Sequence, residues 1–319
     1  MALNVVTSSN IANPWATLLT TRINEEYLKV FEPELVFWQF SEAPVSQKGY
    51  NSVTWRKPQR YEVTASQAEM SAWVTPNGTE LKIDSITVTS KQYGLYTVLS
   101  DELLDMFDFA SLPAVVNDLV MQNLARIIDR VVQDEVLDNA TNRFYAATTS
   151  GWVRAANRAA LTAANKMFML DTVTAATRLQ GNFAPLINWS YFCLINPAVY
   201  FSLQTETNIG SFIDVAKYSN PDKIYAGEVG MYWNVRFVRS AYIKTYQSAI
   251  KVYPTLFLWG QAYGAAQLQD IQVIEKALGS GGVEDPLNQR MSIGAKVHFA
   301  SKILQQASIQ VFESAGYDS

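Results

Sequence analysis

Hydrophobic residues recur at helical spacing over one long stretch of the chain, Ser111 to Asn139. Ser111 can cap the first turn through its hydroxyl, and Pro113 near the start interrupts no helical hydrogen bond. The apolar face would carry Val116, Val120, Leu124, Ile127 and Val131, and the solvated side would carry Asp118, Asp129, Arg130, Asp134 and Asp138, with Arg130 and Asp134 able to pair. The pattern predicts an amphipathic helix of about 42 Å, at ~1.5 Å per residue.

Alternating apolar and polar residues predict two strands before this helix, at 51–61 and 86–99. The segment between them is mostly polar and contains a Pro-Asn-Gly turn signal. We expect a two-stranded loop that projects from the body. Because a two-stranded ribbon is only marginally stable alone in water, this loop should lie on another subunit. The candidate intersubunit contacts are Trp73, Pro76, Asn77 and Gly78.

Shorter elements occupy the rest of the chain. A capped short helix is expected at 100–108, and Gly181 is expected to end a later helix in a left-handed conformation. The other predicted elements are a helix at 162–179, a strand at 189–195, a helix at 198–203, a turn and one strand with Trp233, Val235 and Phe237 on one face at 227–240, a strand at 256–259, and a closing strand pair at 291–299 and 303–312. This order, without an internal repeat, predicts an α+β fold.

Composition and charge narrow the classes of function. The 319 residues are 49% apolar and 17% charged, so the chain can bury a substantial core. A net charge of −4 without a basic tract argues against a protein that grips nucleic acid through phosphate contacts. The N-terminus lacks the features of a secretory signal, and no run reaches the ~18 apolar residues of a membrane helix. We expect a soluble protein, made inside the cell, with no membrane partner.

Candidate catalytic residues are few. His298 is the sole histidine and lies in a strand pattern, which favours a polar residue on a sheet over a general base. Cys193 is the sole cysteine, so intramolecular disulfides and a Cys-based zinc site are excluded and a small buried hydrophobe is expected. The glycines at 279–282 lack the Lys-Ser or Lys-Thr of a phosphate loop and are expected to form a flexible connector.

An acidic cluster precedes the long helix: Asp101, Glu102, Asp105 and Asp108. Such a cluster could serve paired-carboxylate chemistry or bind a divalent cation, so a carboxylate-dependent soluble enzyme is one alternative. Acidic residues are also favoured at helix N-termini, and that interpretation is preferred here. We expect no catalytic residue, no cofactor-binding residue, no cofactor and no metal site.

Two segments resemble the major capsid proteins of tailed bacteriophages. The segment 227–240, GEVGMYWNVRFVRS, contains the Gly-x-x-Gly turn that precedes a strand in that family, here Trp233 to Val238. The segment 285–304, DPLNQRMSIGAKVHFASKIL, contains the family's Asp-Pro-Leu-x-Gln sequence followed by a Gly-x-Lys strand, here Gly294 and Lys296. The order of elements agrees over nearly the whole chain.

The resemblance implies the capsid fold that tailed phages share with encapsulins and herpesviruses. Its four parts would be an N-terminal arm at 1–49, an extended β-loop at 50–100, a peripheral domain at 101–160 and 264–319 with the spine helix 111–139, and an axial domain at 161–263. It implies self-assembly, without catalysis, into hexamers and pentamers of an icosahedral head that encloses the phage genome. The protein would be made in the host cytoplasm and reside in the virion.

The resemblance also implies partners and leaves alternatives. The chief partner would be further copies of the chain, with scaffolding, portal and decoration proteins as further candidates and packaged DNA bound only by non-specific contact. An encapsulin-like nanocompartment shell is a second alternative. Some family members crosslink their shells through a loop lysine and an asparagine. Lys82 and Lys91 occupy the loop region here, and we expect them to be ordinary lysines.

Overall fold

A computed structural model describes residues 36–42, 51–59, 80–106, 112–148, 153–184, 190–206, 228–260, 262–280 and 285–318. The chain divides into two compact units. Among the described residues, the smaller unit comprises Gly94–Asn123 and Val273–Ala295, and the larger unit comprises the described parts of Glu34–Tyr93, Leu124–Gln272 and Lys296–Ser319. None of the helices in the described part of the chain combines the length and the hydropathy that a membrane span requires.

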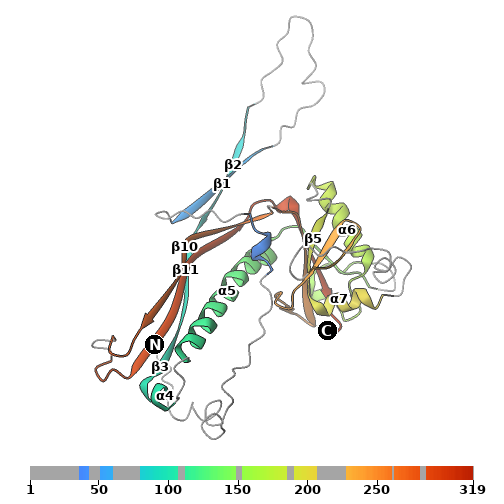
Figure 1. Cartoon of the computed structure of the whole chain (residues 1–319). Coiled ribbons are helices and arrows are strands. Elements are labelled where there is room, and N and C mark those ends of the chain that lie inside the picture. Colours follow the sequence, from blue (N-terminus) through green and yellow to red (C-terminus); the bar gives the residue numbers. More distant parts are fainter. Residues whose placement is uncertain are drawn as a thin grey trace, which may run out of the picture. The chain divides into compact units, whose positions relative to one another are not determined.

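The longest helix in the described part of the chain is α5 (Leu112–Asn139), which confirms the predicted helix to within one residue (Figure 1). Leu124, Ile128, Val132 and Val136 are its buried apolar residues in the larger unit, together with Leu137. Asp129, which periodicity placed on the solvated side, is buried at 1% exposure. The prediction for that residue was wrong, because its carboxylate accepts hydrogen bonds from the Trp38 N–H outside the helix and from the Gln133 amide within it, as described below.

The other helices among the described residues are short. They are α4 (Asp101–Met106), α6 (Met169–Gly181) and α7 (Pro197–Gln204), with 3-10 turns η1 (Trp38–Phe40), η2 (Arg158–Ala160) and η4 (Gln306–Ser308). Helix α6 begins later than predicted, since Asp171 accepts the Phe168 N–H at 3.0 Å and so caps the first turn there. The left-handed residue beyond α6 is Phe183 (φ 58°), and Gly181 is instead the last residue of the helix.

The described strands form three sheets. One pairs β1 (Ser52–Pro58) with β2 (Ile83–Thr89) in antiparallel orientation. A second has the order β10 (Tyr263–Lys276), β11 (Arg290–Ile303), β3 (Lys91–Ser100). The third has the order β4 (Arg143–Tyr145), β12 (Ile309–Ala315), β9 (Lys251–Leu258), β5 (Tyr191–Ile195), β7 (Val235–Arg239), β6 (Glu228–Tyr232), and β8 (Tyr246–Gln247) pairs with β9.

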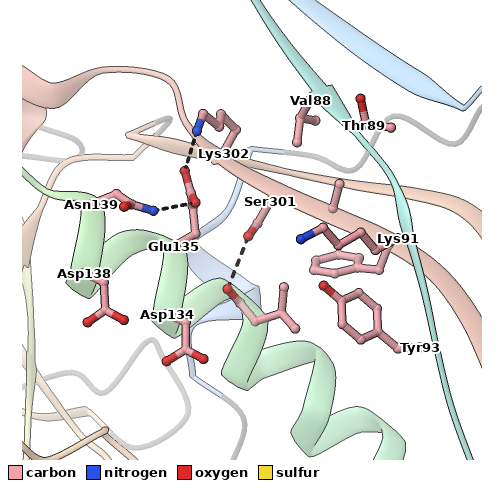
Figure 2. Close-up of a pocket in the computed structure, with 13 residues that line it drawn as sticks. Val88, Thr89, Lys91, Tyr93, Asp134, Glu135, Asp138, Asn139, Ser301 and Lys302 are labelled. Carbon is pink, nitrogen blue, oxygen red and sulfur yellow. Dashed lines mark hydrogen bonds and ion pairs between the residues drawn. The ribbon is translucent and has the colours of Figure 1, made fainter.

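Three strand predictions need correction. The predicted strand 86–99 is two strands that meet at Ser90, because β2 pairs with β1 and β3 with β11; the Ser90 N–H donates to the Asn51 carbonyl at 2.9 Å. The end of β2 and the start of β3 there line a cavity (Figure 2). The predicted closing pair at 291–299 and 303–312 does not form, since β11 and β12 belong to different sheets. The single strand predicted at 227–240 is a hairpin whose turn is Trp233-Asn234, with φ of 45° and 60°.

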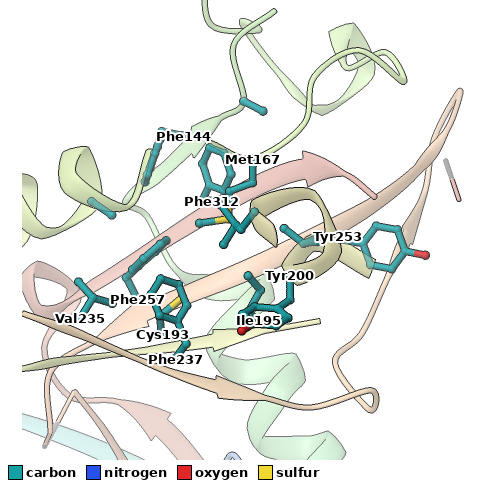
Figure 3. Packing of buried hydrophobic residues seen from close by; sticks show 14 of the residues in the cluster. Phe144, Met167, Cys193, Ile195, Tyr200, Val235, Phe237, Tyr253, Phe257 and Phe312 are labelled. Carbon is teal, nitrogen blue, oxygen red and sulfur yellow. The ribbon is translucent and has the colours of Figure 1, made fainter. Parts of the chain in front are cut away.

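The main core of the larger unit lies around the seven-stranded sheet, where buried side chains from α6, α7 and five of the strands meet (Figure 3). Phe257 and Phe312 lie in its centre and are completely buried. Burying a side chain of this size contributes about 1.5–3 kcal/mol. Cys193 is also completely buried, which confirms the predicted small hydrophobe, and burial raises the pKa of its thiol.

The smaller unit has a core of its own. Leu99, Met291 and Ile293 are buried there, and Leu103, Leu104 and Val116 pack against them. Strands β3 and β11 approach closely at Gly294, where a Cβ atom would lie 2.9 Å from the Cβ of Tyr96.

Candidate functional site

The predicted intersubunit contacts Trp73, Pro76, Asn77 and Gly78 lie outside the described residues. The ribbon of β1 and β2 leads toward them and is held by its backbone ladder and by the hydroxyls of Thr54 and Thr87, 2.8 Å apart. Leu81 and Ile83 lie at the far end of this ribbon and are 61% and 55% exposed.

A cavity of about 550 Å³ lies where the ribbon meets the rest of the larger unit (Figure 2). The last turns of α5 form one wall, and the start of β3 and the end of β11 form the others. Lys302 of β11 pairs with Glu135 of α5 at 3.1 Å, and the Asn139 amide donates to the same carboxylate at 2.7 Å. Lys91 and Tyr93 of β3 line the opposite side. The walls therefore carry acidic, basic and apolar side chains, and no single type lines the cavity.

A cluster of charged groups fixes the exposed side of the α5 C-terminus. The Lys244 ammonium donates to Asp134 and to Asp138, each at 2.7 Å, and the Tyr246 hydroxyl donates to Asp138 at 2.6 Å. Arg130 lies 3.6 Å from Asp134, which confirms the predicted pair. Burial alone would raise the pKa of Asp138, but the hydrogen bonds from Lys244 and Tyr246 outweigh it and lower that pKa. This cluster ties α5 to the segment that joins β7 to β9.

A buried carboxylate extends these contacts into the sheet. The Glu313 side chain on β12 has no exposed area, and Arg158 donates to it through Nε and Nη2, both at 2.7 Å. Arg143 donates to the same carboxylate and to the Leu137 carbonyl at the end of α5. The Arg158 guanidinium lies 3.5 Å from the centre of the Tyr246 ring. The hydrogen bond to Glu313 is the main reason that the pKa of Arg158 is raised. A continuous polar network thus joins β12, η2 and α5.

A second buried carboxylate holds the segment that contains η1. Asp129 accepts the Trp38 N–H at 3.1 Å and the Gln133 amide at 3.1 Å. Gln133 also donates to the Tyr242 carbonyl at 3.1 Å and accepts the Lys244 N–H at 3.0 Å. Burial raises the pKa of Asp129, and its hydrogen bonds offset only part of that effect. Asp129 and Gln133 of α5 therefore hold the segments around Trp38 and Tyr242, which are distant from α5 in sequence.

The sequence reasoning missed Glu313, Arg143 and Arg158. The predicted strand at 303–312 ended just before Glu313, so its carboxylate was not placed in the sheet. The available signal was a carboxylate directly after Val311 and Phe312 in a predicted strand, since a charge in a buried strand requires a partner. The partners themselves lie 170 and 155 residues away, and no local pattern identifies them.

The residues weighed for catalysis do not converge. His298 is half-buried on β11, at a position that alternates with buried apolar neighbours. Asp101 accepts the Glu102 N–H at 2.8 Å at the start of α4, and Asp108 lies outside the described residues. Among the residues whose placement is described, no three His, Cys, Asp or Glu side chains gather as a metal site would require. The polar clusters of the larger unit act between elements and stabilise the body.

Comparisons with known proteins agree with this arrangement. A comparison with curated proteins gives no match. Among solved structures, the chain is similar to the capsid of Ralstonia phage GP4, with a TM-score of 0.71, 12% identity, and 99% of this chain and 98% of that chain covered. It is also similar to the capsid of the cyanophage P-SCSP1u, with a TM-score of 0.67, 17% identity, and 95% and 94% covered. The cyanophage Pam1 capsid matches over the full length of both chains, with a TM-score of 0.66 and 11% identity.

At these identities the solved structures show the fold, which is the α+β capsid fold that the resemblance implied. The family itself is shown by sequence, because a family model described as phage capsid protein matches residues 83–305, well over half of the chain. Capsid family and fold together imply a structural protein without enzymatic activity, and the encapsulin-like and carboxylate-enzyme alternatives are not favoured. The chain belongs to the phage capsid protein family and is the major structural subunit of an icosahedral head.

Proposed function

We propose that this subunit assembles into hexamers and pentamers and that the loop between β1 and β2 lies on a neighbouring copy. The observation that carries the proposal is the ribbon itself. Only Val53 is buried along its two strands, where it packs against Ala266 with Trp55 and Val88 beside it. A ribbon this exposed is marginal alone in water, so a second surface accounts for its stability. The proposed contacts of the loop are Trp73, Pro76, Asn77 and Gly78.

The proposed domain organisation has four parts: the arm at 1–49, the extended loop at 50–100, the peripheral domain at 101–160 and 264–319, and the axial domain at 161–263. The length of helix α5 supports this organisation, in which α5 is the spine helix of the peripheral domain. The dense core around the seven-stranded sheet supports an axial body built mainly from 161–263.

The proposed partners other than the chain itself are scaffolding, portal and decoration proteins. Packaged DNA is proposed to touch the shell only by non-specific contact, which the net charge of −4 supports, since a wall that bound DNA tightly would hinder packaging and release. Synthesis in the host cytoplasm, followed by residence in the virion, completes the proposal.

Electron microscopy of the expressed protein tests the proposal directly. The wild-type chain should form closed shells with hexameric and pentameric units. Replacing residues 62–79 by a short Gly-Ser turn should leave a folded subunit, judged by an unchanged urea transition, that forms no shells. A Trp73→Ala variant is the matched point substitution and should weaken assembly without abolishing folding. Normal shells from the loop replacement would refute the role proposed for the loop.

The same particles test the lysine crosslink. We expect boiling in detergent to release subunits that migrate as single chains, because we expect neither Lys82 nor Lys91 to form a covalent crosslink. A covalent ladder that Lys82→Arg or Lys91→Arg removes would contradict that expectation.

A further inference from the structure

Arginines gather around β4, the edge strand of the seven-stranded sheet, although the net charge of the chain is −4. Two of them donate to the buried Glu313 carboxylate, as described above. Two others lie over the ring of Phe144, the middle residue of β4, with guanidinium carbons 5.1 and 4.6 Å from the ring centre. The first pair is Arg143 and Arg158, and the second is Arg154 and Arg178. One edge of an acidic protein is therefore locally basic.

The charge of Arg154 is matched within the subunit. Its Nη2 lies 2.8 Å from the Asp171 carboxylate, which is 1% exposed, and its Nη1 donates to the Tyr145 carbonyl at 3.1 Å. Asp171 also accepts the Phe168 N–H at the start of α6. These contacts fix the Arg154 guanidinium beside the Phe144 ring.

The charge of Arg178 is not matched in this way. Arg178 is exposed in the last turn of α6, and no carboxylate in the described part of the chain pairs with it. Asp171 lies seven residues earlier on the same helix, about 10 Å along its axis at ~1.5 Å per residue. Glu206 accepts the Met169 N–H at 2.9 Å, so it too lies at the first turn of α6. Both acidic groups are thus at the opposite end of the helix from Arg178.

Two guanidinium groups beside one ring repel each other. Burial and the repulsion from Arg154 together lower the pKa of Arg178. The Phe144 ring holds both groups in place, since a guanidinium is attracted to an aromatic face. A guanidinium that packs by its face keeps its in-plane N–H donors available for an oxyanion. The pair is therefore arranged to gain free energy when an anion binds.

We propose that Arg178, with Arg154 beside it, binds a phosphate group of the nucleic acid that the head encloses. The arginine fork suits the geometry of phosphate. Double-stranded DNA carries one negative charge per about 1.7 Å of its axis, so phosphate is abundant inside a filled head. One unmatched arginine per subunit gives a weak contact that salt weakens further, which is compatible with packaging and release.

This contact rests on the proposed assembly into a DNA-filled head and names residues for the non-specific contact with DNA. Free phosphate in solution is a second source of the same chemistry. A carboxylate of a neighbouring subunit is the competing occupant. The two experiments below distinguish these possibilities.

A thermal melt of unassembled subunits tests the anion site. Phosphate stabilises proteins in general, so it is compared with chloride at equal ionic strength in wild type and in two variants. Phosphate should raise the melting temperature of wild type and of the control Arg239→Gln, at another exposed arginine of the larger unit, by similar amounts. In Arg178→Gln the rise should be less than half as large. Equal rises in all three proteins would overturn the site.

Arginine labelling of heads identifies the source of the phosphate. Phenylglyoxal should label Arg178 at least about threefold more slowly in DNA-filled heads than in the same heads after DNA release, because a bound phosphate occupies its donors. Arg239 is the reference for entry of the reagent. Equal rates in filled and emptied heads, or equal protection of Arg239, would overturn DNA as the occupant. Protection of Arg178 in both kinds of head would indicate a neighbouring subunit and also overturn it. Absence of hexamers and pentamers would overturn the proposed assembly, whereas the melt of unassembled subunits would still test the anion site.

Discussion

The Glu313 carboxylate offers a direct test of what stabilises the larger unit. Glu313→Gln keeps the side-chain volume but removes the charge, which leaves Arg143 and Arg158 without their counter-ion at 16% and 33% exposure. Removing one partner of a buried ion pair costs about 3–5 kcal/mol, because the remaining charge is uncompensated. Arg158 is a third exposed, and water screens part of that cost. We therefore expect the free energy of unfolding to fall by about 3 kcal/mol.

Urea denaturation of unassembled subunits measures this change, provided that the dependence of the free energy on urea concentration is the same in both proteins. The matched control is Arg130→Met, which breaks the exposed pair with Asp134, whose side chains are 41% and 48% exposed. An exposed pair within one helix contributes about 0.3–0.5 kcal/mol, so the control should change little. A loss below about 1 kcal/mol for Glu313→Gln, or equal losses in the two variants, would refute the assignment of Glu313 as a buried anchor.

Three further changes test other parts of the body. Asp138→Asn should cost about 1 kcal/mol at neutral pH in urea denaturation, a value reduced because the side chain is 42% exposed. Its folded pKa lies below the reference value of 3.8, so this contribution is present above that pH and is lost as the pH falls through the folded pKa. A cost of the substitution that does not decrease as the pH is lowered below 3.8 would contradict the cause. Gly294→Ala places a Cβ 2.9 Å from that of Tyr96 and should cost about 1–3 kcal/mol, whereas Gly181→Ala meets no atom within 4 Å and should not destabilise the subunit, as thermal melts would show. Cys193 should react with a thiol reagent only at the rate of unfolding, and prompt labelling of native subunits would contradict its burial.

Elements with a local signal were predictable from sequence. The amphipathic repeat and a proline near its start marked α5 to within one residue. Helix α7 follows from Asn196 and Pro197, since the Asn196 side chain accepts the Ala198 N–H at 2.9 Å and proline suits a first turn. Cys193 followed from the apolar run around it. In each case the residues that determine the outcome lie within a few positions of one another.

Features that depend on distant partners were not predictable in the same way. Asp129 has the spacing of a solvated residue, yet it is buried because Trp38, 91 residues earlier, donates to it. The apolar residues of β11 and β12 predict strands but carry no information about which strand pairs with which. Trp233 has a high strand propensity, and only the hairpin geometry shows that it occupies a turn. The loop residues Trp73 to Gly78 lie outside the described chain and stay a prediction.

The distribution of polar and exposed apolar residues fits a subunit better than a monomer. In the larger unit, the buried carboxylates of Asp129 on α5 and Glu313 on β12 accept hydrogen bonds from segments that are distant in sequence. Large exposed side chains lie instead at turns, at the tail and on the ribbon, including Phe183, Trp233 and Ile83. Exposed apolar side chains on the ribbon, such as Leu81 and Ile83, cost free energy in water. We expect a subunit to recover that free energy where contact with a neighbour removes these side chains from water.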